Sequence, residues 1–261
     1  MLERGNQTLK VKAMKQAAST TSVKKITQLG PQTAALDPAD FLAQTAKASK
    51  EAAEELNRDR AKSKQDQADS ALGRSGIPKR FVGKRLCDFK PECVGSNKAL
   101  NICTRYRDNF KDKILPHGVN MIMTGNTGTG KTHLSAAILH NVISHGGSGV
   151  FVSVSEMLRF IRSAYGFGAK ITEEEAFNTF VKPDLLVLDE VGVAIGDEEK
   201  RKAMVFDVIN ARYNAVKPIL LLGNLNAEEM EAYLGQRVWD RMKEGGGPVI
   251  PFTWGSHRGK S

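Results

Sequence analysis

Hydrophobic residues from about residue 97 onward follow two patterns: short unbroken apolar runs, and longer stretches in which apolar residues recur every three or four positions. The first pattern is typical of strands buried in a sheet, and the second is typical of amphipathic helices. The apolar runs predict strands at Val119 to Thr124, Gly149 to Val154, Asp184 to Asp189, Pro218 to Gly223 and Val249 to Phe252. The last strand is expected at a sheet edge, because Pro251 has no N–H to donate to a neighbour.

The helical pattern alternates with these runs. It predicts helices at Asn97 to Phe110, from Lys131 onward, at Glu156 to Tyr165 with Ser155 as the cap, at Glu173 to Phe180 and at Arg201 to Tyr213. Strands that alternate with helices indicate the α/β class, with an open, mostly parallel sheet flanked by helices. Ligands of such sheets bind beyond the carboxyl ends of the strands.

The N-terminal region, residues 1–75, has a different composition, in which polar residues and alanine dominate. Asp37, followed by a proline, is typical of a helix start, and a polar helix running through Leu56 would present a thin apolar stripe to a partner. A disordered basic arm fits the composition equally well. Because glycine and proline cluster at 73–78, we expect a helical, partly disordered region over residues 1–75 and a globular domain over residues 76–261.

A glycine-rich loop follows the first predicted strand. Its sequence, Gly125-Asn126-Thr127-Gly128-Thr129-Gly130-Lys131-Thr132, satisfies the pattern G-x-x-x-x-G-K-[ST] at every fixed position. Glycines let the backbone turn its N–H groups toward an anion, and the following helix adds the positive end of its dipole. We therefore expect ATP to bind here, with Lys131 at the β and γ phosphates and the Thr132 hydroxyl on Mg²⁺. The flanking strand and helix argue against the alternative, a merely flexible loop.

Two consecutive acids, Asp189 and Glu190, end a predicted buried strand. Asp189 would hold magnesium directly or through water, and Glu190 would position and polarise the water that attacks the γ-phosphate. Asn224 lies just past another apolar strand, where it could orient the same water. The alternatives are a pair of solvated acids and an asparagine in a turn.

Three arginines near the C-terminus are candidates for contact with the γ-phosphate. Arg237 and Arg241 lie four positions apart, on one face if their segment is helical. Either could enter a neighbouring subunit's nucleotide site as an arginine finger, or could instead pair with Asp240 or line a basic face. Arg258, in the tail, is a further candidate for sensing the γ-phosphate.

Composition points to a second anionic partner. The net charge of +9 suggests nucleic acid in addition to ATP, although a generally basic surface would give the same charge. The three cysteines show neither a C-x-x-C pair nor zinc spacing, so we expect reduced thiols. No apolar run approaches the ~20 residues that span a bilayer, and the N-terminus lacks an apolar signal core. We therefore expect a cytoplasmic protein with no membrane contact.

With these residues in place, the chain resembles the AAA+ ATPases of the DnaC/IstB group, and most closely the DnaC-type replicative helicase loaders. The resemblance covers roughly Arg74 to the C-terminus. It rests on Arg74-Ser75-Gly76-Ile77-Pro78, the glycine-rich loop with His133-Leu134-Ser135 after it, Asp189-Glu190-Val191-Gly192, Gly223-Asn224-Leu225-Asn226, Arg237-Val238-Trp239-Asp240-Arg241-Met242 and the tail from Trp254 to Arg258. It implies a P-loop AAA+ core preceded by a small polar helical region.

The resemblance also implies partners and an activity. A protein of this kind binds the hexameric DnaB-type replicative helicase through its N-terminal region, opens the ring and helps to place it on single-stranded DNA in an ATP-dependent cycle. By position, Arg241 resembles the finger that acts between subunits, which implies self-association, with Arg237 as the second candidate. Arg258 resembles the family's second sensor arginine.

The resemblance also implies roles for four further residues. Arg162 and Tyr165 fall where related proteins contact DNA, and a cation beside an aromatic ring suits sequence-tolerant binding of single strands. A solvated face and core packing are the alternatives for these two side chains. Ile77 and Pro78 resemble the stretch that packs on adenine.

Three other functions stay open from the sequence. An IstB-like transposition ATPase would coat duplex DNA and recruit a transposase. A P-loop phosphotransferase would have little use for Glu190, and a non-hydrolysing adaptor would not need Lys131, Thr132, Glu190 and Asn224 together. The acidic run at 196–199 weakens the case for a second DNA contact.

Overall fold

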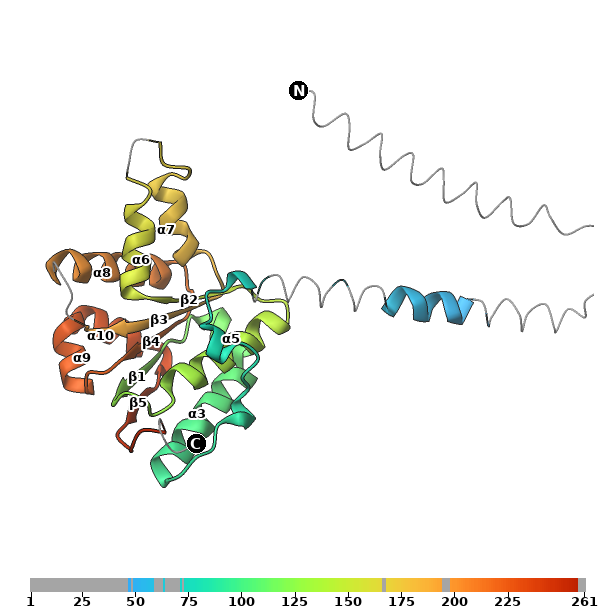
Figure 1. The fold of residues 1–261 in the computed structure, drawn as a ribbon, viewed down its shortest axis with the longest axis horizontal. Coiled ribbons are helices and arrows are strands. Elements are labelled where there is room, and N and C mark those ends of the chain that lie inside the picture. The colour runs from blue at the N-terminus through green and yellow to red at the C-terminus, as the bar shows by residue number, and fades with distance from the viewer. Residues whose placement is uncertain are drawn as a thin grey trace, which may run out of the picture. The chain divides into compact units, whose positions relative to one another are not determined.

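The computed structural model describes residues 47, 49–58, 63, 71, 73–165, 168–193 and 198–257, and Figure 1 shows them as a ribbon. The chain divides into two units, Met1–Arg60 and Ala61–Ser261. In the first unit the described residues are helical and exposed. The predicted helix start at Asp37 lies outside the described residues, and the predicted domain boundary at residue 75 stays a prediction.

Five strands form one sheet in which every pair of neighbours is parallel. In sheet order they are β2 (Gly149–Ser153), β3 (Leu185–Val191), β4 (Ile219–Gly223), β1 (Met121–Gly125) and β5 (Val249–Phe252). All five predicted strands are confirmed. The strand that contains Pro251 lies at an edge, as its missing N–H requires.

The connections between the strands are mainly helical. The longer helices are α3 (Val94–Asp108), α5 (Lys131–Ser144), α6 (Val154–Arg162), α7 (Glu173–Val181), α8 (Glu198–Asn214), α9 (Ala227–Leu234) and α10 (Gln236–Lys243). Shorter segments are the 3₁₀ turns Lys79–Phe81, Leu86–Asp88 and Glu244–Gly246, the π-helical Phe110–Ile114 and α4 (Leu115–His117). Within the described ranges, no helix has both the length and the apolar character needed to cross a bilayer.

Helices cover both faces of the sheet, so alternate strand residues enter two separate cores. Met121 and Met123 pack with α3 and α5 on one face, whereas Ile122 packs with α6, α8 and α10 on the other. Figure 1 shows the same division of the helices around the sheet. Burial on both faces explains why the strands read as unbroken apolar runs.

Several helix starts differ from the sequence prediction, and α3 and α8 each begin three residues earlier than predicted, at Val94 and Glu198. The expected cap at Ser155 is wrong, because α6 begins two residues earlier and Ser153 is its cap. The Ser153 hydroxyl accepts from the Glu156 N–H at 3.3 Å, and the Glu156 carboxylate accepts from the Ser153 N–H at 3.0 Å. Helix α9 was not predicted, although Asn226 and Glu229 form the same reciprocal cap at its start.

Candidate nucleotide-binding site

The glycine-rich loop joins the carboxyl end of β1 to the first turn of α5. Gly125, Gly128 and Gly130 have φ values of 108°, 76° and 102°, a region that side chains rarely allow. A Cβ at Gly125 would lie 2.4 Å from the carbonyl oxygen of Phe252, and a Cβ at Gly130 would lie 2.4 Å from the ring of Phe89. The backbone therefore requires glycine at both positions.

Lys131 is buried at the start of α5, with its ammonium turned into the loop. Its Nζ donates to the carbonyl oxygens of Gly125 at 2.5 Å and Asn126 at 2.6 Å. Both acceptors are neutral and belong to the loop, so they keep the ammonium within the loop. A ligand can replace them as acceptors. A phosphate oxygen would offer the same ammonium a charged and stronger acceptor.

Asp189 and Thr132 lie close together although they are 57 positions apart in the sequence. The carboxyl end of β3 and the start of α5 are at the same edge of the sheet. The Thr132 hydroxyl donates to the Asp189 carboxylate at 3.2 Å. Burial raises the pKa of Asp189, against the lowering effect of the hydrogen bonds from the Glu190 N–H and Thr132 and of the Lys131 charge. A carboxylate and a hydroxyl at this separation are ligands of the kind that Mg²⁺ binds.

Glu190 follows directly and adopts a left-handed backbone conformation, with φ at 60°. Its N–H donates to the Asp189 carboxylate at 2.7 Å, and its own side chain is exposed. Left-handed residues other than glycine are uncommon and concentrate at functional sites. The turn therefore separates the two acids. The Asp189 carboxylate is held inward at Thr132, and the Glu190 carboxylate can face the cavity.

A cavity of about 730 Å³ opens at this edge of the sheet. It brings together eight of the residues expected from the sequence: Thr127, Gly128, Gly130, Lys131, Thr132, Asp189, Glu190 and Asn224. Gly125, Asn126 and Thr129 belong to the same loop, where Asn126 accepts from the Thr129 hydroxyl at 2.7 Å. The geometry thus assembles the predicted acids, amide and loop around one space.

Several lining residues were not predicted. Arg80, Phe81, Phe89, His133 and His257 also face this cavity. The Phe89 ring lies 5.9 Å from that of His133 and 5.5 Å from that of His257, measured between centroids. His133 could have been found from its position beside Thr132, whereas the segment around Phe89 shows no periodic pattern in the sequence.

Ile77 and Pro78, expected at the adenine, precede these residues. Ile77 is buried in the core on the α5 side, and Pro78 is exposed. Neither lines the cavity, where the same segment contributes Arg80 and Phe81 instead. Their contact with a base stays a prediction.

The C-terminal tail supports the loop from outside. The Trp254 indole N–H donates to the Thr129 carbonyl at 3.0 Å, and the His257 backbone N–H donates to the Gly128 carbonyl at 2.9 Å. The His257 ring lies 3.2 Å from the Glu92 carboxylate. Arg258, the candidate sensor, lies outside the described residues, although the tail reaches the loop one position before it.

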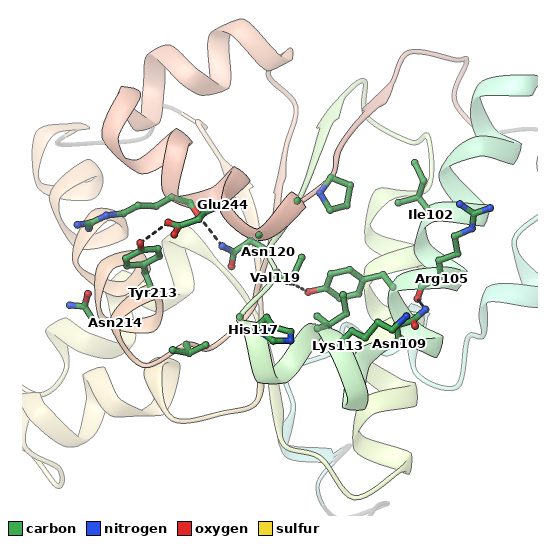
Figure 2. Close-up of a pocket in the computed structure, with 18 residues that line it drawn as sticks. Ile102, Arg105, Asn109, Lys113, His117, Val119, Asn120, Tyr213, Asn214 and Glu244 are labelled. Carbon is green, nitrogen blue, oxygen red and sulfur yellow. Dashed lines mark hydrogen bonds between the residues drawn. The ribbon is translucent and has the colours of Figure 1, made fainter.

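Arg241, the expected finger, lies at the opposite edge of the sheet, where the strands begin. It lines a second cavity, of about 980 Å³, which Figure 2 shows. Its guanidinium donates to the Asn210 side chain and lies 4.8 Å from the centroid of the Tyr213 ring. The Tyr213 hydroxyl in turn donates to Glu244 at 2.6 Å. Arg241 therefore does not meet its own subunit's loop, and Arg237 is exposed on the same helix.

Arg162 and Tyr165, expected at DNA, lie together at the end of α6. The side chains of both are exposed, with Tyr165 52% exposed. The Tyr165 N–H donates to the Arg162 carbonyl at 3.1 Å, and its hydroxyl donates to Glu173 at 3.1 Å. Core packing is therefore wrong as an alternative for Tyr165, and contact with DNA stays a prediction.

Comparison with known proteins gives relatives for most of the globular part. A family model described as IstB-like ATP binding protein matches residues 114–241. The replicative helicase loader DnaC of Buchnera aphidicola subsp. Acyrthosiphon pisum (strain APS) is 32% identical over 187 residues, which cover 72% of this chain and 74% of that protein. The DnaC of Escherichia coli (strain K12) is 31% identical over 189 residues, covering 72% and 75%.

Solved structures share the fold. A crystal structure of the DnaC helicase loader matches with a TM-score of 0.56 at 23% identity, over 67% of this chain and 99% of that chain. The replication initiator DnaA bound to AMPPCP and single-stranded DNA matches with a TM-score of 0.54 at 21% identity, over 67% and 50%. The chain has the AAA+ fold and belongs to the DnaC family of replicative helicase loaders.

Proposed function

We propose that this chain is an ATP-driven loader that places a hexameric replicative helicase on single-stranded DNA. One observation carries the ATPase part: Thr132, Asp189 and Glu190 meet at a glycine-rich loop whose backbone admits only glycine at two positions. Family membership, at 32% identity to a replicative helicase loader, supports the loading part.

The loop residues bind and orient the nucleotide. Lys131 exchanges its two carbonyl acceptors for oxygens of the β and γ phosphates, and the N-terminus of α5 adds its dipole. Thr132 and Asp189 provide the oxygen ligands for Mg²⁺, which would neutralise charge on the phosphates when bound. Burial raises the pKa of Asp189 by disfavouring its ionised form, and a bound cation would offset that cost.

Glu190 and Asn224 face the cavity from the ends of adjacent strands, β3 and β4. Glu190 orients the attacking water and accepts its proton, while the Asn224 amide fixes the water from a second direction. The strained backbone of Glu190 serves this role by turning its carboxylate away from that of Asp189.

Self-association would complete the site. Arg241 lies at the sheet edge opposite its own loop, so it can serve as a finger only for another subunit. Arg237 is the second candidate, and Arg258 is the proposed sensor of the γ-phosphate. In such an assembly, Arg241 would exchange Asn210 and Tyr213 for phosphate oxygens of the partner's nucleotide.

Two further contacts belong to this proposal. The N-terminal region, residues 1–75, would bind a DnaB-type helicase, and the helix at 49–58 is among its described residues. Arg162 and Tyr165 would contact single-stranded DNA, since both are exposed at one end of α6.

Binding to the host's replicative helicase tests the loading part. The full chain and a chain lacking residues 1–75 are each mixed with purified helicase and separated by gel filtration. We expect the full chain to bind and the shortened chain to lose binding while it still hydrolyses ATP. Failure of the full chain to bind would contradict the proposal.

A second candidate function is favoured by one observation, the match of residues 114–241 to IstB-like ATP binding proteins. A transposition ATPase of this kind would coat duplex DNA in the presence of ATP. Binding of ATP-loaded protein to duplex and single-stranded oligonucleotides of equal length distinguishes the two functions. A loader is expected to prefer the single strand.

A further inference from the structure

Arg201, in the first turns of α8, is a buried charge held by two neutral groups. Its side chain is only 7% exposed. One guanidinium nitrogen, Nη1, donates to the Val193 carbonyl at 2.7 Å, and the other, Nη2, donates to the Ser155 hydroxyl at 2.8 Å. Burying a guanidinium against neutral acceptors is costly, and an apolar side chain would fill the space at lower cost. This suggests that Arg201 positions its two partners.

The first partner ends the turn that contains Glu190. The Val193 N–H donates to the Glu190 carbonyl at 3.4 Å, which closes a turn after β3. Within the turn, Glu190 and Gly192 both have positive φ, and a Cβ at Gly192 would lie 2.3 Å from the Leu225 side chain. A backbone of this kind persists only where its surroundings fix it. Arg201 holds the last carbonyl of the turn, and the Leu225 side chain leaves no room for a Cβ at Gly192.

The second partner belongs to α6. Ser155 is the second residue of that helix, and its hydroxyl accepts from Arg201, while Ser153 caps the helix. From Ser155 the helix rises to Arg162 over about 10 Å, at ~1.5 Å per residue. One guanidinium therefore joins the turn of the proposed water-directing acid to the helix that ends at Arg162 and Tyr165.

We propose that Arg201 is a positioning residue that fixes the Glu190 turn and couples it to α6. This inference rests on the proposed ATPase function. Arginine suits the role better than lysine, because its rigid fork of donors reaches two acceptors in different directions, whereas a lysine ammonium is a single point. Displacement of α6 by a bound ligand would pull on the same guanidinium and so change the orientation of Glu190.

Steady-state ATP hydrolysis by the full-length Arg201→Gln and Arg201→Lys variants tests the positioning role. We expect kcat to fall about tenfold to a hundredfold, because small misplacements of a catalytic group have effects of this size, while KM for ATP stays within about twofold. Lysine should restore part of the loss. Lys200→Gln is the matched control, since it removes one positive charge from the neighbouring exposed position of α8.

A double mutant separates positioning from general damage. If Arg201 acts through Glu190, then Arg201→Gln adds little to Glu190→Gln, whereas independent effects multiply. Wild-type kcat in Arg201→Gln, or multiplying losses in the double mutant, would overturn the inference. A wild-type chain that does not hydrolyse ATP would instead overturn the proposed function and this inference with it.

Ser155→Ala tests the coupling to α6 with a milder change, because Ser155 is half-buried and Val193 keeps its bond to Arg201. The readout is kcat with and without an oligothymidine strand. We expect Ser155→Ala to keep the basal kcat within about twofold and to lose the change in kcat that the strand causes in the wild-type chain. Equal responses of the two proteins, including no response in either, would overturn the coupling.

Discussion

The two edges of the parallel sheet use charged side chains in opposite ways. At the carboxyl edge, Lys131 and Asp189 face an open cavity and bond to groups that a ligand could replace. At the amino edge, Arg212 is completely buried. The first arrangement suits exchange with a nucleotide, and the second suits permanent connection of the chain.

Arg212 makes that connection with main-chain carbonyls alone. Its guanidinium donates to the carbonyl oxygens of Phe180, Val181, Pro183, Asp184 and Pro218, at 2.8, 3.0, 3.0, 3.5 and 2.7 Å. These carbonyls belong to the end of α7 and to the segments that lead into β3 and β4. Burial lowers the pKa of Arg212 to about 9, which leaves it charged at neutral pH. Changes at the amino edge should therefore affect stability, and changes at the carboxyl edge should affect turnover.

Replacing Arg212 should have the largest effect on stability. Arg212→Met removes the Arg212 donor from five carbonyls, of which those of Phe180 and Pro218 lie in buried bonds, and we expect the free energy of unfolding to fall by about 3–5 kcal/mol. Urea denaturation followed by circular dichroism measures the change. Arg105→Met, at an exposed arginine of α3, is the control and should stay within ~0.5 kcal/mol of wild type. A loss below ~1 kcal/mol in Arg212→Met would contradict the structural role.

Arg241 is an exception at the amino edge, since it is proposed to act in hydrolysis. Arg241→Ala should lower ATP turnover by about a hundredfold or more, with little loss of stability. Mixing Arg241→Ala with Lys131→Ala subunits should restore turnover, because one variant supplies the nucleotide and the other supplies the arginine. Turnover that stays low at every mixing ratio would show that Arg241 does not act between subunits and stabilises the fold instead.

At the carboxyl edge, replacing Asp189 should cause a smaller change in stability than replacing Arg212. The folded-state pKa of Asp189 is raised, so ionising this carboxyl lowers the stability of the fold. This loss of stability is absent at pH values below the unfolded pKa and is complete above the folded pKa. Asp189→Asn keeps the shape and removes this cost, and we expect it to be more stable than wild type at pH 7 by about 0.5–1 kcal/mol. The difference should shrink as pH falls toward ~4, where both states of the wild type become protonated.

Turnover in Asp189→Asn should nevertheless be lost, because the amide is a poor ligand for Mg²⁺. Denaturation at several pH values and a phosphate-release assay measure the two effects. A variant that is less stable than wild type by the same amount at every pH would show that Asp189 stabilises the fold rather than serving the ligand.

Local sequence patterns were sufficient for the sheet and the loop. Both faces of each central strand are buried, so Leu185 to Leu188 form an unbroken apolar run, and the loop glycines have a fixed spacing. Contacts between distant segments were not accessible in this way. Trp254 supports Thr129 across 125 positions, and nothing near Trp254 in the sequence indicates this contact.

Arginines were the hardest residues to interpret from sequence. Arg201 and Arg212 occur in a segment predicted as a helix, where the pattern suggests an ordinary polar face. The structure buries both, because carbonyls and a hydroxyl from other elements converge on them. Similarly, helical periodicity could not decide between Ser153 and Ser155 as the cap of α6. That choice depends on Glu156, which lies three positions after Ser153.

The proposed roles of Glu190 and Lys131 are separated by comparing Glu190→Gln with Lys131→Ala in two assays, binding of a fluorescent ATP analogue and steady-state phosphate release. We predict that Glu190→Gln binds the nucleotide as wild type does and loses turnover by about a hundredfold or more, because only the water-directing group is changed. Lys131→Ala should lose binding itself. Wild-type turnover in Glu190→Gln would contradict the proposed ATPase mechanism, since the acid that the strained turn presents to the cavity would then have no part in hydrolysis.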